Sequence, residues 1–220
     1  MTLSLSGWQR RILLVLAGLA VLALFILAFT AGRVSAGPSY PDTNSADAGF
    51  ARDMQVHHGQ AVEMSMIVRE KVDDETLRAV AYDIATTQQH QAGQMYGWLE
   101  EWGLSQSSAQ PRMAWMADSS GDHGGMDMGQ GGDPASMLSP DGLMPGMATS
   151  EQLDALRAAT GDDAARLYLN LMITHHLAGV EMAEAGAELA GTDQVRELAM
   201  KMQSGQQSEI ALMEGLLDAL

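Results

Sequence analysis

Histidine and methionine occur together twice in this sequence, at spacings that can gather them around a metal ion. Met54 precedes the adjacent pair His57-His58 by three and four residues, and Met64 follows His57 by seven. In a helix these intervals place thioethers and imidazoles on neighbouring turns of one face. The same arrangement returns with identical spacing in a second set, Met172, His175, His176 and Met182. We therefore treat these side chains as candidate metal ligands.

Copper is the metal that this donor set favours. Imidazole and thioether suit copper, whereas Mg²⁺ and Ca²⁺ take oxygen ligands. The chain has no cysteine, so thiolate sites and disulfides are excluded. Imidazole must be neutral to coordinate, and we therefore expect binding to weaken as the pH falls through about 6.5.

A second group of possible donors lies between the two sets. Seven methionines fall between residues 113 and 147, and His123 stands close to Met126 and Met128. Clustered thioethers beside a histidine and aspartates can bind Cu(I) or Ag(I) loosely. The alternative is that some of these methionines dock on the folded domain as gap fillers.

An internal repeat organises the chain beyond the N-terminus. Residues 47–102 align without gaps on residues 165–220 at an offset of 118, and 14 of the 56 positions are identical, both His-His pairs included. Each repeat is expected to be one supersecondary unit that buries its apolar face against the other.

The periodicity within each repeat is helical. Repeat 1 predicts a helix up to Asp73-Asp74 and a second one that ends before Gly103; repeat 2 predicts helices over about 163–190 and from Asp193 to the end, with Thr192 or Asp193 as cap. Two αα-hairpins, 47–103 and the later part of 150–220, then form an all-α four-helix bundle. In such a bundle one imidazole of each pair can coordinate while the other bonds across the bundle.

The segments around the hairpins have a different composition. Residues 37–46 form a spacer, and 104–149 form a Met/Gly-rich linker that cannot bury enough apolar surface to order itself alone. A short helix over 150–159 is predicted after it, because Thr149 and Gln152 match a capping box.

Residues 1–36 predict a membrane segment. Ile12 to Ala31 is a run of 20 uncharged residues, about 30 Å long as a helix, which matches the hydrocarbon core of a bilayer. Arg10 and Arg11 precede it, so the rest of the chain is expected outside the cytoplasm. A cleaved signal peptide is the alternative, since Val34-Ser35-Ala36 resembles a cleavage site. The domain is thus membrane-anchored on the extracytoplasmic side, or secreted or periplasmic if the segment is removed.

Charge and motif content exclude several function classes. The net charge is −16, and all 28 acidic residues follow residue 36, which disfavours nucleic acid as a partner. A di-iron carboxylate bundle requires Glu-x-x-His, which is absent, and Glu63 and Glu181 fall on the face opposite the methionines, where we expect them to be solvated. No nucleophilic triad or phosphate loop is present, so we expect no enzyme activity.

The remaining alternative is a protein without a metal role. Methionine commonly fills helical cores, and buried histidine often serves as a hydrogen-bonding group. The protein would then be a structural or interaction subunit of a membrane or envelope complex, with another envelope protein or a second copy of itself as partner.

Three sequence patterns resemble the DUF305 family of exported bacterial proteins. The first is Asp47-x-x-Phe50-x-x-x-Met54-x-x-His57-His58-x-x-Ala61-x-x-Met64. The second is the set Gln88, Gln89, Met95, Trp98, Leu99 and Trp102, and the third is Leu143-Met144-Pro145-Gly146-Met147. The likeness spans about residues 45–220.

The resemblance implies a ferritin-like fold and, for some members, copper binding in the periplasm and support of copper tolerance. It marks as candidate ligands the same eight side chains, Met54, His57, His58, Met64, Met172, His175, His176 and Met182. Two positions depart from the family pattern: His90-Gln91 replaces the usual Glu-Ile, and Tyr168 replaces the usual Phe. We expect neither departure to touch the proposed ligands.

Overall fold

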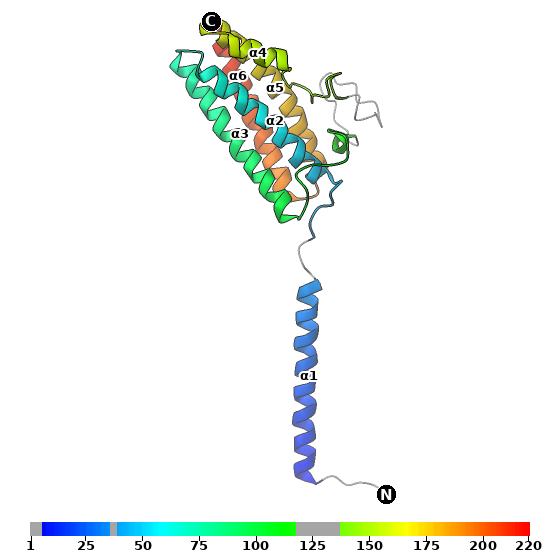
Figure 1. Ribbon diagram of the computed structural model, residues 1–220. Helices are drawn as coiled ribbons and strands as arrows, with labels where there is room; N and C mark the ends of the chain where they lie inside the picture. Colours follow the sequence, from blue (N-terminus) through cyan, green and yellow to red (C-terminus); the bar gives the residue numbers. More distant parts are fainter. Residues whose placement is uncertain (1–5, 36–38, 118–136) are drawn as a thin grey trace. The chain divides into compact units, whose positions relative to one another are not determined.

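The computed structural model describes residues 6–35, 39–117 and 137–220, and all regular structure in these residues is helical (Figure 1). The chain divides into two units, Met1–Tyr40 and Pro41–Leu220. The helices are α1 (Gly7–Ser35), α2 (Ala46–Arg69), α3 (Glu75–Glu101), α4 (Ser150–Ala158), α5 (Gly161–Leu189) and α6 (Asp193–Asp218), with a short 3₁₀ turn, η1 (Ala114–Met116). The predicted all-α fold is confirmed.

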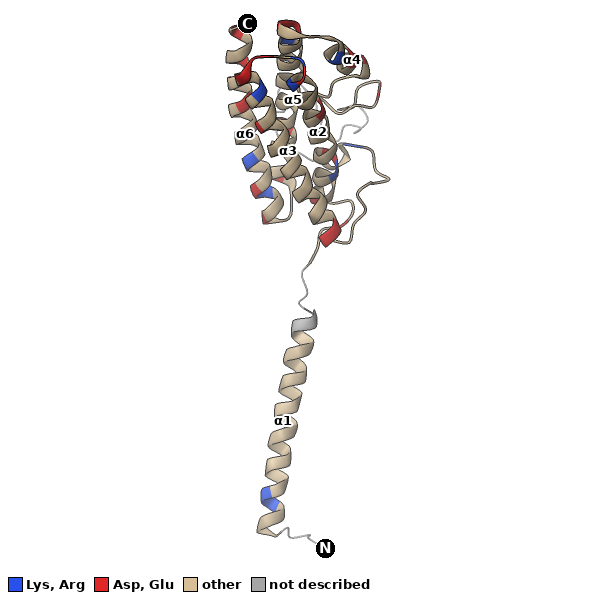
Figure 2. Cartoon of the chain, turned by 60° about the vertical axis from the view of Figure 1, so that its left-hand side comes forward, with Lys and Arg blue, Asp and Glu red and all other residues tan. Residues whose placement is uncertain are grey.

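Helix α1 makes up the first unit. Gly7–Gly32 is long and apolar enough to cross a membrane by length and composition, and the described side chains along it are exposed. Arg10 and Arg11 lie near its N-terminal end, where Figure 2 shows basic residues in blue. A signal sequence would meet the same test, so length and composition leave both predicted alternatives open.

The second unit is a bundle of two helical hairpins, α2–α3 and α5–α6, which meet through α2 and α5 (Figures 1 and 2). Helices α2 and α5 run antiparallel, since the Gly161 amide at the start of α5 donates to the Lys71 carbonyl beyond the end of α2. Ser65 and Tyr168 join the two helices through a hydrogen bond of 3.0 Å between their hydroxyls. The phenol that departs from the family pattern therefore has a buried partner in the bundle.

The helix ends follow the predicted signals in most places. Asp74 caps α3 through the Leu77 amide, and Gly103 takes a φ of +67° just after α3, as expected of a C-terminal glycine. Thr149 and Gln152 form the predicted capping box of α4.

Thr192 is the N-cap of α6, one of the two residues predicted for this position. Its side chain does not accept from the helix, so the hydrogen bond expected of a cap is missing. The buried carboxylate of Asp47, in the first turn of α2, accepts hydrogen bonds instead from the Gly191 amide, the Thr192 amide and the Thr192 hydroxyl. An acceptor from the other hairpin thus satisfies donors at the turn before α6.

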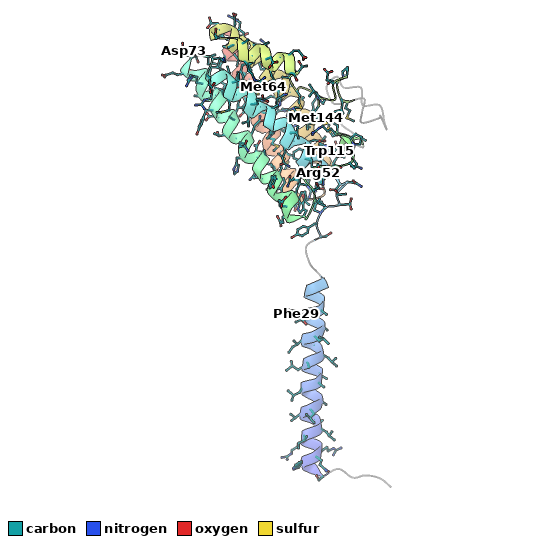
Figure 3. The ribbon with its side chains drawn as sticks, in the orientation of Figure 1. Phe29, Arg52, Met64, Asp73, Trp115 and Met144 are labelled. Carbon is teal, nitrogen blue, oxygen red and sulfur yellow. The ribbon has the colours of Figure 1, made fainter. Side chains whose placement is uncertain are left out.

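Two parts of the linker pack on the bundle. The indole of Trp115 lies over Gly49, where a Cβ would come within 2.6 Å of it, and meets Phe50 edge-to-face at 5.6 Å. Met113, Met116 and Met144 are buried in the same apolar cluster as Phe50, and Figure 3 shows Trp115 and Met144 on one flank of the bundle. These three methionines are gap fillers. The other candidate donors of the linker, His123, Met126 and Met128, lie outside the described residues.

Candidate metal centre

The four histidines of the duplicated pairs lie in the interior where α2 meets α5. All four side chains are fully buried. The rings of His57 and His175, which are equivalent positions of the two repeats, stack with centroids 3.7 Å apart at 30°. The Nε2–H of His175 donates to the His57 carbonyl at 3.0 Å. Two histidines at equivalent positions of the sequence repeat therefore stack against each other in the structure.

The outer histidine of each pair bonds to the second helix of its own hairpin. His58 Nε2 lies 2.8 Å from Gln91 Oε1 on α3, and His176 Nε2 lies 2.8 Å from Glu209 Oε2 on α6. The outer imidazole of each pair thus bonds within its own hairpin, and the contact to the other hairpin that we expected is made by His175 through the His57 carbonyl. The prediction that the departure at His90-Gln91 leaves the proposed ligands untouched is wrong, because Gln91 contacts His58 directly.

The four candidate methionines flank the imidazoles in two groups. Met54 and Met182 belong to one apolar cluster, and Met64 and Met172 to another. None of the four is exposed. The antiparallel crossing of α2 and α5 thus places a methionine from each repeat on each side of the histidines. The spacing within each helix keeps these thioethers within one or two turns of an imidazole.

This part of the core holds polar atoms that lack hydrogen-bond partners among the described residues. They are His57 Nδ1 and Nε2, His58 Nδ1, His175 Nδ1, His176 Nδ1, and the amide oxygen and nitrogen of both Gln88 and Gln206. Leaving a buried polar group unsatisfied costs about 1–3 kcal/mol. Buried groups of this kind are satisfied by an ordered water, an ion or another polar ligand. Imidazole nitrogens are also donor atoms that copper takes.

Burial lowers the pKa of three of the imidazoles, His57, His58 and His175. Desolvation lowers the pKa of His57 to about 3, and the neighbouring imidazoles His58 and His176 add to the effect, while the Pro145 carbonyl opposes it. Desolvation also lowers the pKa of His58 to about 4, although the hydrogen bond that His58 donates to Gln91 opposes the shift. It lowers the pKa of His175 well below the usual value. The lowered pKa values place protonation of these three rings below pH 6.5 in the metal-free protein, and the pH dependence of metal binding stays a prediction.

The third motif of the sequence, Leu143-Met144-Pro145-Gly146-Met147, covers the histidines. Gly146 has a φ of +74°, and a Cβ there would lie 2.6 Å from Ala178 Cβ and 3.1 Å from His175 Cα. The Gln60 side chain holds the next residue, Ala148, by accepting from its amide at 2.6 Å and donating to its carbonyl at 2.9 Å. The backbone of this segment can therefore lie directly against α5 beside His175.

A second buried side chain fixes the other part of the linker. Asp53 Oδ2 accepts from the Met113 amide at 2.8 Å and from the Trp115 indole at 3.0 Å. Burial raises the pKa of Asp53, and these hydrogen bonds and the nearby guanidinium of Arg112 oppose that shift. Asp53 and Gln60 lie four residues before and three after His57, so α2 anchors both linker segments around the metal candidates.

The acidic residues contribute little to this centre. Glu63 is exposed and pairs with Arg157, as expected of a solvated side chain. Glu181 is half-buried and not fully solvated as predicted. Among the described residues no three histidine, aspartate or glutamate side chains are grouped so as to hold a metal ion. A metal held here would need thioether or amide donors in addition to imidazole.

Sequence reasoning missed four residues of the centre: Gln88, Gln91, Gln206 and Glu209. Gln88 and Gln206 are equivalent positions of the repeat, as are Gln91 and Glu209. The alignment of the two repeats already pairs these residues. To place them at the centre, one also has to know which face of α3 and α6 is turned toward the histidines.

The fold and the centre define an all-helical bundle of two equivalent hairpins, each with a His-His pair turned inward. The chain matches the model of the domain of unknown function DUF305 over residues 47–217, and it belongs to this family. It is 44% identical to a DUF305 protein from Streptomyces coelicolor, described as a candidate secreted protein, whose crystal structure superposes with a TM-score of 0.68 over 81% of this chain and 95% of that one.

Two further solved structures share the fold. A DUF305 fragment from Deinococcus radiodurans is 26% identical, with a TM-score of 0.61 over 83% of this chain and all of that one (100%). CopM, in a Cu(II)-bound form, is 22% identical, with a TM-score of 0.55 over 80% of this chain and 97% of that one. No curated protein sequence gave a match.

Proposed function

We propose that this protein binds copper outside the cytoplasm and buffers it or hands it on through its histidine and methionine side chains. The observation that carries the proposal is the fully buried, stacked pair His57–His175, in which both nitrogens of His57 and Nδ1 of His175 lack partners among the described residues. Buried methionines from both repeats flank this pair.

The chemistry of the donors favours copper over harder metals. Neutral imidazole and thioether are soft to borderline ligands, which suit Cu(I) and Cu(II). Magnesium and calcium would need several oxygen ligands, and the acidic side chains of the described residues do not provide such a group. The fold that this chain shares with CopM, a protein solved with Cu(II), is compatible with the proposal.

We also propose that α1 anchors the domain to a membrane, with the bundle on the extracytoplasmic side. Its apolar length spans a bilayer, and Arg10 and Arg11 precede it in the orientation of the positive-inside rule. The candidate secreted relative from Streptomyces supports an exported bundle. A site that lacks thiols is also suited to an oxidising compartment.

The test is a competitive Cu(I) titration of the full-length protein in detergent micelles against a chromophoric chelator. We expect the wild type to bind tighter than micromolar, and the double variant His57→Ala/His175→Ala to lose this binding. His90→Ala is the matched control, because His90 is exposed on α3 and lies outside the buried cluster. It should bind as the wild type does.

Substitution of the thioethers avoids the risk that the histidine variants unfold. Met54→Leu and Met182→Leu conserve volume and polarity in the core and remove only the sulfur. We expect them to weaken Cu(I) binding with little change in thermal stability. Micromolar or weaker binding that none of these substitutions changes would contradict the proposal and favour a structural or interaction subunit.

A further inference from the structure

The two halves of the buried centre differ at one pair of equivalent positions. Gln91 in repeat 1 and Glu209 in repeat 2 each contact the outer histidine of their hairpin at 2.8 Å. The geometry is the same, but one partner is a neutral amide and the other a carboxylate. The two repeats therefore place these side chains alike, but the side chains differ in charge.

The hydrogen bond that His176 donates to Glu209 determines which nitrogen of His176 is available. A carboxylate accepts, so the Nε2 of His176 carries the proton. The other nitrogen, Nδ1, is buried without a partner among the described residues. In the tautomer that this contact selects, the lone pair of Nδ1 faces the protein interior.

The same argument extends to the other rings. His175 donates from Nε2 to the carbonyl of His57, and its Nδ1 is likewise buried and without a partner. His58 has the same arrangement, with its Nε2 bonded to Gln91 Oε1 and its Nδ1 open. Nδ1 is therefore the available donor atom in three of the four histidines.

The charge of the side chain that accepts the hydrogen bond changes how strongly the imidazole binds a metal through its other nitrogen. A carboxylate that accepts from the far nitrogen fixes the ring orientation and raises the basicity of an imidazole ligand more than a neutral amide does. Glu209 also adds a negative charge beside the centre, and its side chain is 26% exposed. A cation that enters the bundle thus meets a stronger ligand at His176 than at His58.

We propose that the centre loads unequally: His176, oriented by Glu209, is the first histidine to take up a soft cation, through Nδ1, and His58, oriented by Gln91, is the weaker counterpart. Glu209 acts as a positioning residue and does not itself bind the ion. This inference rests on the proposed copper function, because it assigns an order to ligands of that same site.

The test exchanges the two partners. Full-length protein with ¹⁵N-labelled histidine is titrated in micelles with Ag(I), a diamagnetic ion with the ligand preferences of Cu(I), and each ring is followed by NMR. In the wild type we expect His176 to respond before His58. In Glu209→Gln the order should disappear, with about a ten-fold loss of affinity for the first ion. In the exchanged variant Gln91→Glu/Glu209→Gln, His58 should respond first.

The controls separate this inference from the proposed function. Glu214→Gln removes the same charge from an exposed position of α6 and should leave the order unchanged. The metal-free spectra report the tautomers directly, with the proton of His176 on Nε2 in the wild type and a mixed population in Glu209→Ala. Equal loading of both halves with binding intact, or a proton on Nδ1 of His176, would overturn the inference alone. No binding of Ag(I) or Cu(I) by the wild type would overturn the proposed function and this inference together.

Discussion

The imidazole of His57 lies in the protein interior, and neither of its nitrogens makes a hydrogen bond of ordinary geometry among the described residues. A charged ring at this place would have to leave water and face the other imidazoles of the cluster. Desolvation therefore lowers its pKa to about 3, and the pKa of His58 to about 4. The same neutral state that suits a copper ligand makes the metal-free core sensitive to acid.

The sign of this sensitivity follows from the two states. An unfolded histidine takes up a proton below about pH 6.5, whereas His57 in the folded protein does so only near its lowered pKa of about 3. Its contribution to stability is thus complete above pH 6.5 and is lost as the pH falls toward 3. Each such histidine costs about 2 kcal/mol of unfolding free energy between pH 6.5 and 5.

We accordingly expect the melting temperature of the metal-free protein to fall steeply between pH 7 and pH 5 when circular dichroism follows unfolding. His57→Phe replaces the ring with one that cannot be protonated, so its fall should be smaller. His90→Ala should behave like the wild type, because His90 is exposed. A melting temperature that is flat across this range would contradict the neutral buried cluster.

The helical elements were largely predictable, since their apolar periodicity and end signals are local properties of the sequence. Asp74, Gly103 and the capping box at Thr149 mark ends where the structure has them. The role of Asp47 was not predictable, because its acceptors bind donors 144 and 145 residues away. Contacts between hairpins depend on how the helices pack, which periodicity alone does not determine.

The linker shows the same division between local and tertiary information. Its composition predicted a segment unable to order itself alone, and the structure shows that α2 supplies the missing anchors at Asp53 and Gln60. The glycine of the Leu-Met-Pro-Gly-Met motif is visible in the sequence, but only the structure explains why a glycine is needed there, because it contacts α5. Gly146 combines a positive φ with contact distances to Ala178 and His175 that leave no room for a Cβ.

Gly146→Ala tests this packing, and Gly142→Ala is its matched control. Both glycines have a φ of +74°, but a Cβ at Gly142 meets nothing within 4 Å. The control should cost about 1 kcal/mol for the backbone conformation alone, and Gly146→Ala about 2–4 kcal/mol because it also forces the motif away from α5. Chemical denaturation measures both. Equal losses in the two variants would show that the motif does not lie tightly on the helix.

The chain comprises two compact units of different composition. Unit 1 contains an apolar helix with the dimensions of a bilayer span, and unit 2 contains the bundle with its buried donors. This division could be predicted from the sequence, since the length of the apolar run and the distribution of charge can be counted along the chain. The arrangement of side chains in the centre could not be predicted, because Gln91 and Glu209 come from helices whose rotation is set by the fold.

We expect the native protein to remain in the membrane fraction after alkaline carbonate extraction. Its intact mass should include residues 1–36, since the apolar run is longer than that of a typical cleaved signal. Mass spectrometry of protein purified from membranes measures this directly. A mature N-terminus at Gly37 and release into the soluble fraction would show that the segment is a signal peptide.

Copper X-ray absorption of the Cu(I)-loaded full-length protein tests the central claim most directly, because it reports the atoms bound to the metal. The account predicts a mixed shell of nitrogen and sulfur, the donors of the histidines and methionines where α2 meets α5. The sulfur contribution should decrease when the flanking methionines are replaced by leucine. A shell of oxygen and nitrogen without sulfur, unchanged by those substitutions, would contradict it.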